Sequence, residues 1–504
     1  MKHLRFLLCL ALAVTLLTAC GPKGDGSASS SGGGSSVSSS GSGSDPEPAP
    51  APASLTLAAC LSDSFHPVLG TNRSNLTLAP LLYEPLFQLD ETFQPVPVLC
   101  SQAASADGLI WELTLREGIT FSDGSPLTGS VAADALNTAR QSARYAQRLR
   151  DVSSISGQGN MVTVTLVRAN GNLPALLDIP IASGTGDRPV GTGPYVLSET
   201  DGALAARSGW WQGKALPVQT IRLTAASRSE DLVSSFSAGD IGLVDVDLMG
   251  TNAPGYSGSY QTWDYATTEL LYLGLNTQSG LCRTPEVRQA IARAIDRTSI
   301  VQVDFARHAV AAGLPVHPSS PLYNAAQAGT LGYSPQQSQA ALEQLRLTGR
   351  SVTLVVNTEN TAKVSAAQRI AAQLEAVGLT VHLSRLSYDS YVSALAAGNF
   401  DLYLGQVTLT GDFDLAPLLS SSGSLNYGRW QDALGDALLS AFQSAQGETR
   451  TKAAADLFAY LNQQAPIVPV CFKNGSVLTQ WSRLSGLSPV RGNVFYQLEN
   501  WKLS

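Results

Sequence analysis

Residues 351–407 alternate between strand-like and helix-like spacing of their hydrophobic positions. Short runs of β-branched and other apolar residues are typical of buried strands, and two longer segments repeat apolar residues at helical spacing before Gly378 and Gly398. The expected strands are 352–356, 379–386 and 400–407, and the expected helices are 364–377 and 390–397. This β-α-β-α-β order predicts a largely parallel sheet.

A second β-α-β pattern precedes this region and predicts a second sheet-bearing lobe. It consists of strand 220–225, helix 229–238 and strand 241–246. Residues 109–167 have a different pattern, which predicts an inserted α+β subdomain. Its expected elements are a strand at 111–115, a turn at FSDG, a helix at 128–148 and a hairpin around Gly159-Asn160.

The clearest amphipathic helix is expected over residues 284–301. Thr284 can cap it, and Pro285 occupies the first helical position. Its polar face carries Arg288, Arg293 and Arg297, which we interpret as a solvated surface.

The N-terminus has the pattern of a secretion signal. Lys2 and Arg5 precede an apolar run at 6–19, which is shorter than the roughly 20 residues of a membrane-spanning helix. Residues 17–20, LTAC, resemble the bacterial lipoprotein signal, in which the cysteine receives lipid. We therefore expect a signal peptide at 1–19, a lipidated Cys20, and a tether through residue 54 that is rich in Gly, Ser, Pro and Ala.

Composition narrows the class of protein further. The chain has 504 residues, of which 44% are hydrophobic, and a formal net charge of −7, so it can form a large core and has no basic excess for nucleic acid. Cys9 leaves with the signal and Cys20 takes lipid, so four cysteines remain to form disulfides or buried thiols. These are Cys60, Cys100, Cys282 and Cys471.

Motifs for catalysis or metal binding are missing from the sequence. It contains no GxSxG elbow, no GxxxxGK[ST] phosphate loop and no HExxH zinc helix. GWWQGKA at 209–215 has three residues where a phosphate loop needs four. We therefore expect no catalytic residues, no metal and no cofactor.

Seven segments, in order along the chain, together resemble the family-5 extracellular solute-binding proteins, the dipeptide-, oligopeptide- and nickel-binding class of ABC importers. They are LLYEPLF (81–87), WELTLREGITFSDGSPLTGSVAADAL (111–136), PVGTGPYVL (189–197), FSAGDI (236–241), LYLGLNT (271–277), VRQAIARAID (287–296) and AGNFDLYLG (397–405). The resemblance implies an α/β, two-lobed fold like the type II periplasmic binding proteins, with an additional α+β subdomain inserted in the first lobe.

Resemblance and pattern together give a division of the chain. Lobe I is expected to comprise 55–90, 181–268 and 471–504, the inserted subdomain 91–180, and lobe II 269–470. The implied function is capture of a small peptide or similar solute between the lobes and its delivery to an ABC permease and ATPase complex. We expect a monomer held to the membrane by its lipid. A metal chelate, an oligosaccharide or another solute is the alternative ligand, and a surface or signalling lipoprotein without transport is the alternative function.

Candidate ligand contacts follow from the strand-end rule, because ligands of open α/β sheets bind beyond the carboxyl ends of strands. The rule selects the loops 357–360, which begins with Asn357, 387–389 and 408–414. In peptide-binding relatives an aspartate in the last loop pairs with the ligand's ammonium group, which indicates Asp412 or Asp414. This loop, TLTGDFDLAP, lacks the Trp and the Asp-Pro pattern of those relatives, and a turn-capping carboxylate is the alternative.

Four further residues complete the candidate site. By the resemblance, Asn276 lies where the chain crosses between lobes, where it either contacts ligand or fixes the crossover. Trp263, Tyr265 and Trp430 are candidate aromatic walls, with membership of the core as the alternative.

Overall fold

The computed structural model describes residues 54–198 and 202–504. The predicted signal peptide, Cys20 and the tether up to residue 53 lie outside these ranges. Across the described residues no helix is both long and apolar enough to cross a bilayer.

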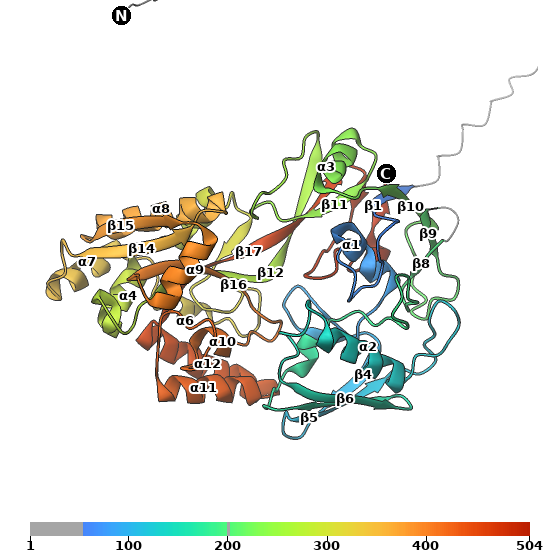
Figure 1. Cartoon of the computed structure of the whole chain (residues 1–504), viewed down its shortest axis with the longest axis horizontal. Helices are drawn as coiled ribbons and strands as arrows, with labels where there is room; N and C mark the ends of the chain where they lie inside the picture. The colour runs from blue at the N-terminus through green and yellow to red at the C-terminus, as the bar shows by residue number, and fades with distance from the viewer. Residues whose placement is uncertain (1–53, 199–201) are drawn as a thin grey trace, which may run out of the picture. The chain divides into compact units, whose positions relative to one another are not determined.

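Lobe I is built on a four-stranded sheet in the order β1-β10-β9-β8 (Figure 1). β1 (Leu55–Ala59) and β10 (Thr220–Ala225) are parallel, and β9 (Ala203–Ala206) and β8 (Tyr195–Leu197) continue the sheet antiparallel. Two helices accompany it: α1 (Arg73–Leu82), capped by the Asn72 side chain, and α3 (Ser229–Ala238), which ends at Gly239 with φ 81°. The alternating residues of β1 face a core that includes Leu55, Leu57 and Ile221.

The inserted subdomain has its own antiparallel sheet, β4-β5-β7-β6. The strands are β4 (Cys100–Ala104), β5 (Ile110–Leu115), β7 (Met161–Leu166) and β6 (Val152–Gln158), and a two-strand hairpin, β2 (Phe87–Leu89) with β3 (Pro95–Pro97), precedes them. Helix α2 (Gly129–Gln141) covers this sheet. A Cβ at Gly157 would lie 1.8 Å from the Gly129 carbonyl oxygen, so only glycine permits this close approach of helix and strand.

Two of the predicted subdomain elements can be compared with the structure. The predicted hairpin is confirmed, because β6 and β7 pair from Gln158 and Met161 outward around Gly159-Asn160. The predicted helix 128–148 is too long, because α2 ends at Gln141. The Ser142 hydroxyl donates to the Ala139 carbonyl while its own backbone is extended, and turns follow.

Lobe II contains the predicted β-α-β-α-β unit. β14 (Ser351–Asn357) pairs in parallel with β15 (Thr380–Leu386) and β16 (Leu402–Thr408). The connecting helices are α8 (Thr361–Ala376) and α9 (Tyr388–Ala397), and α9 ends at Gly398 with φ 76°. These strands belong to a seven-stranded sheet of order β11-β17-β12-β16-β14-β15, with β13 (Ala309–Ala311) also on β17.

Two long strands of this sheet run from one lobe to the other. β12 (Tyr260–Leu275) and β17 (Ile467–Gln480) pair antiparallel along most of their length, side by side in Figure 1. β11 (Leu243–Val246) pairs with the C-terminal end of β17, and β16 pairs with the C-terminal half of β12. The lobe boundaries expected at 268/269 and 470/471 fall inside these strands. The predicted β-α-β unit at 220–246 differs from the unit in lobe II, because its two strands, β10 and β11, belong to different sheets.

The remaining helices complete lobe II. They are α4 (Pro285–Ala294), α5 (Arg297–Ser299), α6 (Ala325–Gly329), α7 (Pro335–Gln344), α10 (Ala416–Leu419), α11 (Ala433–Ser444) and α12 (Gly447–Gln464).

The expected helix 284–301 is shorter in the structure, because α4 ends at Ala294. Its polar face is not a solvated surface at Arg288, which is buried and donates to the carbonyls of Gln464 and Cys282.

The four remaining cysteines are all buried free thiols. Cys282 and Cys471 pack in the same lobe II core, and Cys100 packs in the subdomain core.

Candidate functional site

One face of the shared sheet carries the apolar cores of both lobes. Trp263, Tyr265 and Val477 pack against the lobe I core, and Leu271 and Cys471 pack in the lobe II core. Side chains two residues apart in a strand, and directly paired residues on neighbouring strands, share a face. The face therefore runs from one core to the other, and the pair between them is Glu269 and Lys473.

Charged side chains occupy this middle position. The Lys473 ammonium donates to Asp247 Oδ2 at 2.6 Å and to Glu269 Oε2 at 2.9 Å, and Gln406 Nε2 also donates to Glu269. Lys473 is 5% exposed, whereas the side chains of Asp247 and Glu269 are 35% and 23% exposed. Burial by itself lowers the pKa of Lys473, but the two carboxylates raise it overall, so the ammonium stays charged.

Tyr265 extends the polar region toward lobe I. Its hydroxyl donates to Asp245 Oδ1 at 2.9 Å, and Arg73 Nη2 donates to the Asp245 backbone carbonyl at 3.2 Å. Burial raises the pKa of the Asp245 carboxyl, and the Tyr265 hydroxyl opposes that rise.

Asn357 extends the region toward lobe II. Its Oδ1 accepts from Lys363 Nζ at 2.6 Å, and its Nδ2 donates to Glu359 at 2.8 Å. The Lys363 ammonium lies 5.0 Å from the centre of the Tyr391 ring, and burial lowers the pKa of Lys363 to about 8.

The two lobes meet next to Asn357. Asn360 Nδ2 donates to the Met249 carbonyl at 2.8 Å, and the Met249 amide donates to Asp247 Oδ1 at 3.1 Å. The loop after β14 therefore contacts the loop after β11. We call the whole region the interlobe polar strip, and it comprises Asp245, Asp247, Tyr265, Glu269, Asn357, Asn360, Lys363, Gln406 and Lys473.

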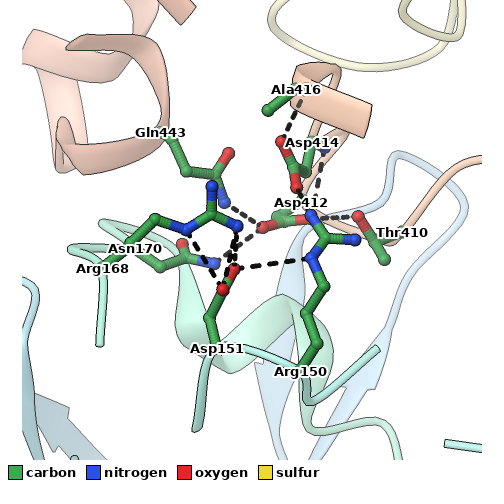
Figure 2. A network of polar contacts seen from close by, with 9 residues as sticks. All are labelled: Arg150, Asp151, Arg168, Asn170, Thr410, Asp412, Asp414, Ala416 and Gln443. Atoms are coloured by element: carbon green, nitrogen blue, oxygen red, sulfur yellow. Dashed lines mark hydrogen bonds and ion pairs between the residues drawn. The ribbon is translucent and has the colours of Figure 1, made fainter. Parts of the chain in front are cut away.

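The acidic loop after β16 lies in a different network, shown in Figure 2. Asp412 is 1% exposed, and its Oδ2 accepts from Asn170 Nδ2 at 2.8 Å and from Gln443 Nε2 at 2.7 Å. Asp414 pairs with Arg150 and accepts from the Ala416 amide at the start of α10. Because Arg150 and Asn170 belong to the inserted subdomain, this network joins the subdomain to lobe II.

The surroundings of Asp414 in this network raise the pKa of its carboxyl above the usual value. Burial is the main cause of its raised pKa, and the neighbouring Asp412 adds to it. The Ala416 amide and Arg150 lower it in part. Ligand contact by either aspartate stays a prediction, since their visible partners are protein groups.

The other predicted contacts are engaged within the protein. The Asn276 amide donates to the carbonyls of Gly398 and Phe400, and its oxygen accepts from two following backbone amides, so it fixes the chain after β12 within lobe II. Trp263 Nε1 donates to Thr479 Oγ1 at 3.0 Å. Trp430 is buried in a lobe II core. Of the predicted residues, the structure thus brings only Tyr265 and Asn357 into the interlobe polar strip.

Sequence reasoning missed Lys473, Glu269 and Asp247. One signal was available, because Lys473 directly follows the apolar run IVPVCF and a lysine in a buried strand needs a partner. Within residues 54–198 and 202–504, no group of three or more His, Cys, Asp or Glu side chains is placed to hold a metal ion.

Two lobes that share long strands, with partly exposed charges between their apolar cores, define a two-lobed binding protein. The chain belongs to the bacterial extracellular solute-binding proteins of family 5, because the model of that family's middle region matches residues 94–427. Membership confirms the expectation of a solute binder that acts outside the cytoplasm and is not an enzyme.

Individual relatives are distant in sequence. The glutathione-binding protein GsiB of Shigella flexneri is 24% identical over an aligned length of 381, and the match covers 68% of this chain and 73% of that protein. The periplasmic murein peptide-binding protein MppA of Escherichia coli K12 is 23% identical over an aligned length of 472, and the match covers 79% of this chain and 84% of that protein. The structure of HbpA2 from Haemophilus parasuis is similar with a TM-score of 0.74 at 19% identity, over 90% of this chain and 99% of that chain. This likeness confirms the predicted fold class.

Proposed function

We propose that the chain is the membrane-tethered substrate-binding component of an ABC importer, which captures a small peptide or similar solute between its lobes and delivers it to the permease. The interlobe polar strip carries this proposal. Relatives named for binding glutathione and a murein peptide support a peptide-like ligand.

The chemistry of the strip suits a ligand with an ammonium group. Asp247 and Glu269 share one ammonium, from Lys473, and keep part of their carboxylate surface exposed. Charge-assisted hydrogen bonds to a ligand ammonium are stronger than neutral ones, and closure of the lobes by a hinge motion would remove water from them.

Calorimetric titration tests the proposal after the solute has been identified. Mass spectrometry of small molecules released from the purified protein by denaturation gives that identity. Glu269→Gln keeps the shape of the side chain and removes its charge, so we expect binding to weaken at least about tenfold. Glu112→Gln changes an exposed glutamate on β5 and is the matched control. Unchanged affinity in both Glu269→Gln and Asp247→Asn would place the solute elsewhere.

Attachment to the membrane is part of the same proposal and rests on the LTAC segment that ends at Cys20. Palmitate labelling of intact cells should mark the wild type and not Cys20→Ala, because Cys20 is the proposed site of the lipid. Stable anchoring requires more than one acyl chain, so the Cys20→Ala protein should also leave the membrane. Label that persists on the Cys20→Ala protein would overturn the lipid anchor and leave solute binding untouched.

A further inference from the structure

A cavity of about 580 Å³ lies between lobe I and the inserted subdomain, apart from the interlobe polar strip. The end of α1, the β2–β3 hairpin, the loop 210–216 and the C-terminal segment 493–500 form its walls. None of the residues of the interlobe polar strip lines it. Its volume is in the range of small-molecule sites, which is roughly 300–1,000 Å³.

Two tryptophans on the cavity wall are fixed by a buried carboxylate. Glu84 is 5% exposed and accepts from Trp211 Nε1 at 2.6 Å, from Trp210 Nε1 at 3.3 Å and from Gln212 Nε2 at 2.6 Å. Burial raises the pKa of Glu84, and these N–H donors oppose that rise. Both indole N–H groups are therefore hydrogen-bonded inside the wall, and the two rings, which are partly exposed, offer apolar surface to a ligand. Because the two side chains are already held in place, they lose little conformational freedom when a ligand binds.

A cation lies beside this aromatic wall. Arg116 lines the cavity, its Nε donates to the Val98 carbonyl at 2.7 Å, and its guanidinium is 6.0 Å from the centre of the Trp211 ring. In the part of the chain that the structure describes, no carboxylate forms an ion pair with Arg116. The other cation of the lining, Lys214, already pairs with Glu499 at 2.6 Å. The planar guanidinium fork of Arg116 matches the geometry of a carboxylate.

We propose that this cavity is a second binding site, for a small organic anion in which an apolar ring carries one carboxylate. The ring packs on Trp210 and Trp211, and the carboxylate binds Arg116. The site shares no residue with the interlobe polar strip, so this binding is independent of the proposed transport of a solute.

Titration with indole-3-acetate, followed by calorimetry, tests the assignment. We expect saturable binding with a Kd of about 1 mM or below, and weaker binding of the uncharged indole-3-acetamide. Arg116→Gln should weaken binding of indole-3-acetate about tenfold or more, because it removes the charge. Arg222→Gln, at an exposed arginine of lobe I outside the cavity, is the matched control and should leave binding unchanged.

Three outcomes would overturn the proposal. They are the lack of saturable binding up to about 10 mM, equal affinity in Arg116→Gln and wild type, and equal affinity for the acid and the amide. Glu269→Gln separates the two sites, because binding of indole-3-acetate that is lost in this variant belongs to the interlobe polar strip. Thermal melts of each variant confirm that it folds.

Discussion

Substitution of Asp412 separates a structural role from a ligand-binding role. The Asp412 carboxylate accepts from Asn170 and Gln443, and also from the Thr410 hydroxyl, in a buried position (Figure 2). Asp412→Ala removes this carboxylate, so the side-chain donors of Asn170, Gln443 and Thr410 lose their hydrogen-bond acceptor. We therefore expect a large loss of stability in the protein even when no solute is present.

The magnitude follows from the lost contacts. A hydrogen bond to a charged group contributes about 1.5–3 kcal/mol, and breaking a buried charged network costs about 3–5 kcal/mol in total because such contributions do not add fully. Asp412→Asn keeps the shape and one carbonyl acceptor, so we expect a cost of about 1–2 kcal/mol. Arg450 Nη2 donates to the Asp412 backbone carbonyl, and both variants keep that contact.

Urea unfolding followed by circular dichroism, without solute, measures these costs. Asp389→Ala at an exposed position in the first turn of α9 is the matched control and should change stability by less than about 0.5 kcal/mol. The structural reasoning is refuted if Asp412→Ala is as stable as this control while its affinity for the transported solute falls about tenfold or more. That result would make the loop a ligand contact, as the sequence predicts.

Three shorter predictions concern pH, backbone packing and thiol chemistry. Burial lowers the pKa of His317 to about 4. The unfolded chain therefore takes up this proton first, and the free energy of unfolding should fall by up to about 3 kcal/mol more in wild type than in His317→Leu between pH of about 6.5 and 4. An equal fall in the free energy of unfolding in urea over this pH range in the two proteins would contradict this. Gly171→Ala should cost about 2–4 kcal/mol of the free energy of unfolding in urea, because its Cβ would lie 1.9 Å from the Ala445 carbonyl oxygen across the contact between subdomain and lobe II. Gly186→Ala, whose Cβ meets nothing within 4 Å, is the control, and equal stability of both variants would argue against that contact. Cys60 should react with a disulfide reagent before the other three thiols, since the Ser62 hydroxyl lowers its pKa whereas burial raises theirs, and a reversed order would contradict the assignment.

Local patterns were enough to predict much of the fold. Helix 229–238 and strand 220–225 have the bounds that the pattern predicts, because their apolar spacing and the glycine after the helix are local signals. The end of α2 was not predictable in the same way. Residues 142–150 contain no glycine or proline, but Tyr145 and Leu149 are buried in the subdomain core through turns instead of a longer helix.

Sheet membership depends on pairing between distant segments. β10 and β11 flank α3, yet β10 pairs with β1 and β11 pairs with β17. No property of residues 220–246 distinguishes this arrangement from a parallel pair, since both arrangements bury the same apolar positions. For the same reason Arg288 was misread, because the carbonyl groups that it reaches belong to segments as distant as Gln464.

The interlobe polar strip shows where the limit lies. Lys473 follows an apolar run in which every residue is buried, and a buried ammonium is costly unless charged or polar partners surround it. The apolar run in the sequence therefore indicates that Lys473 needs a charged or polar partner. It cannot identify the partner, because Asp247 follows β11 and Glu269 lies on β12, and both reach Lys473 only when β17 crosses from one lobe to the other between them. The residues that we propose to bind the solute are thus defined by the same strand crossing that joins the lobes. A rule based on strand ends within one lobe selects Asp412 and Asp414 instead.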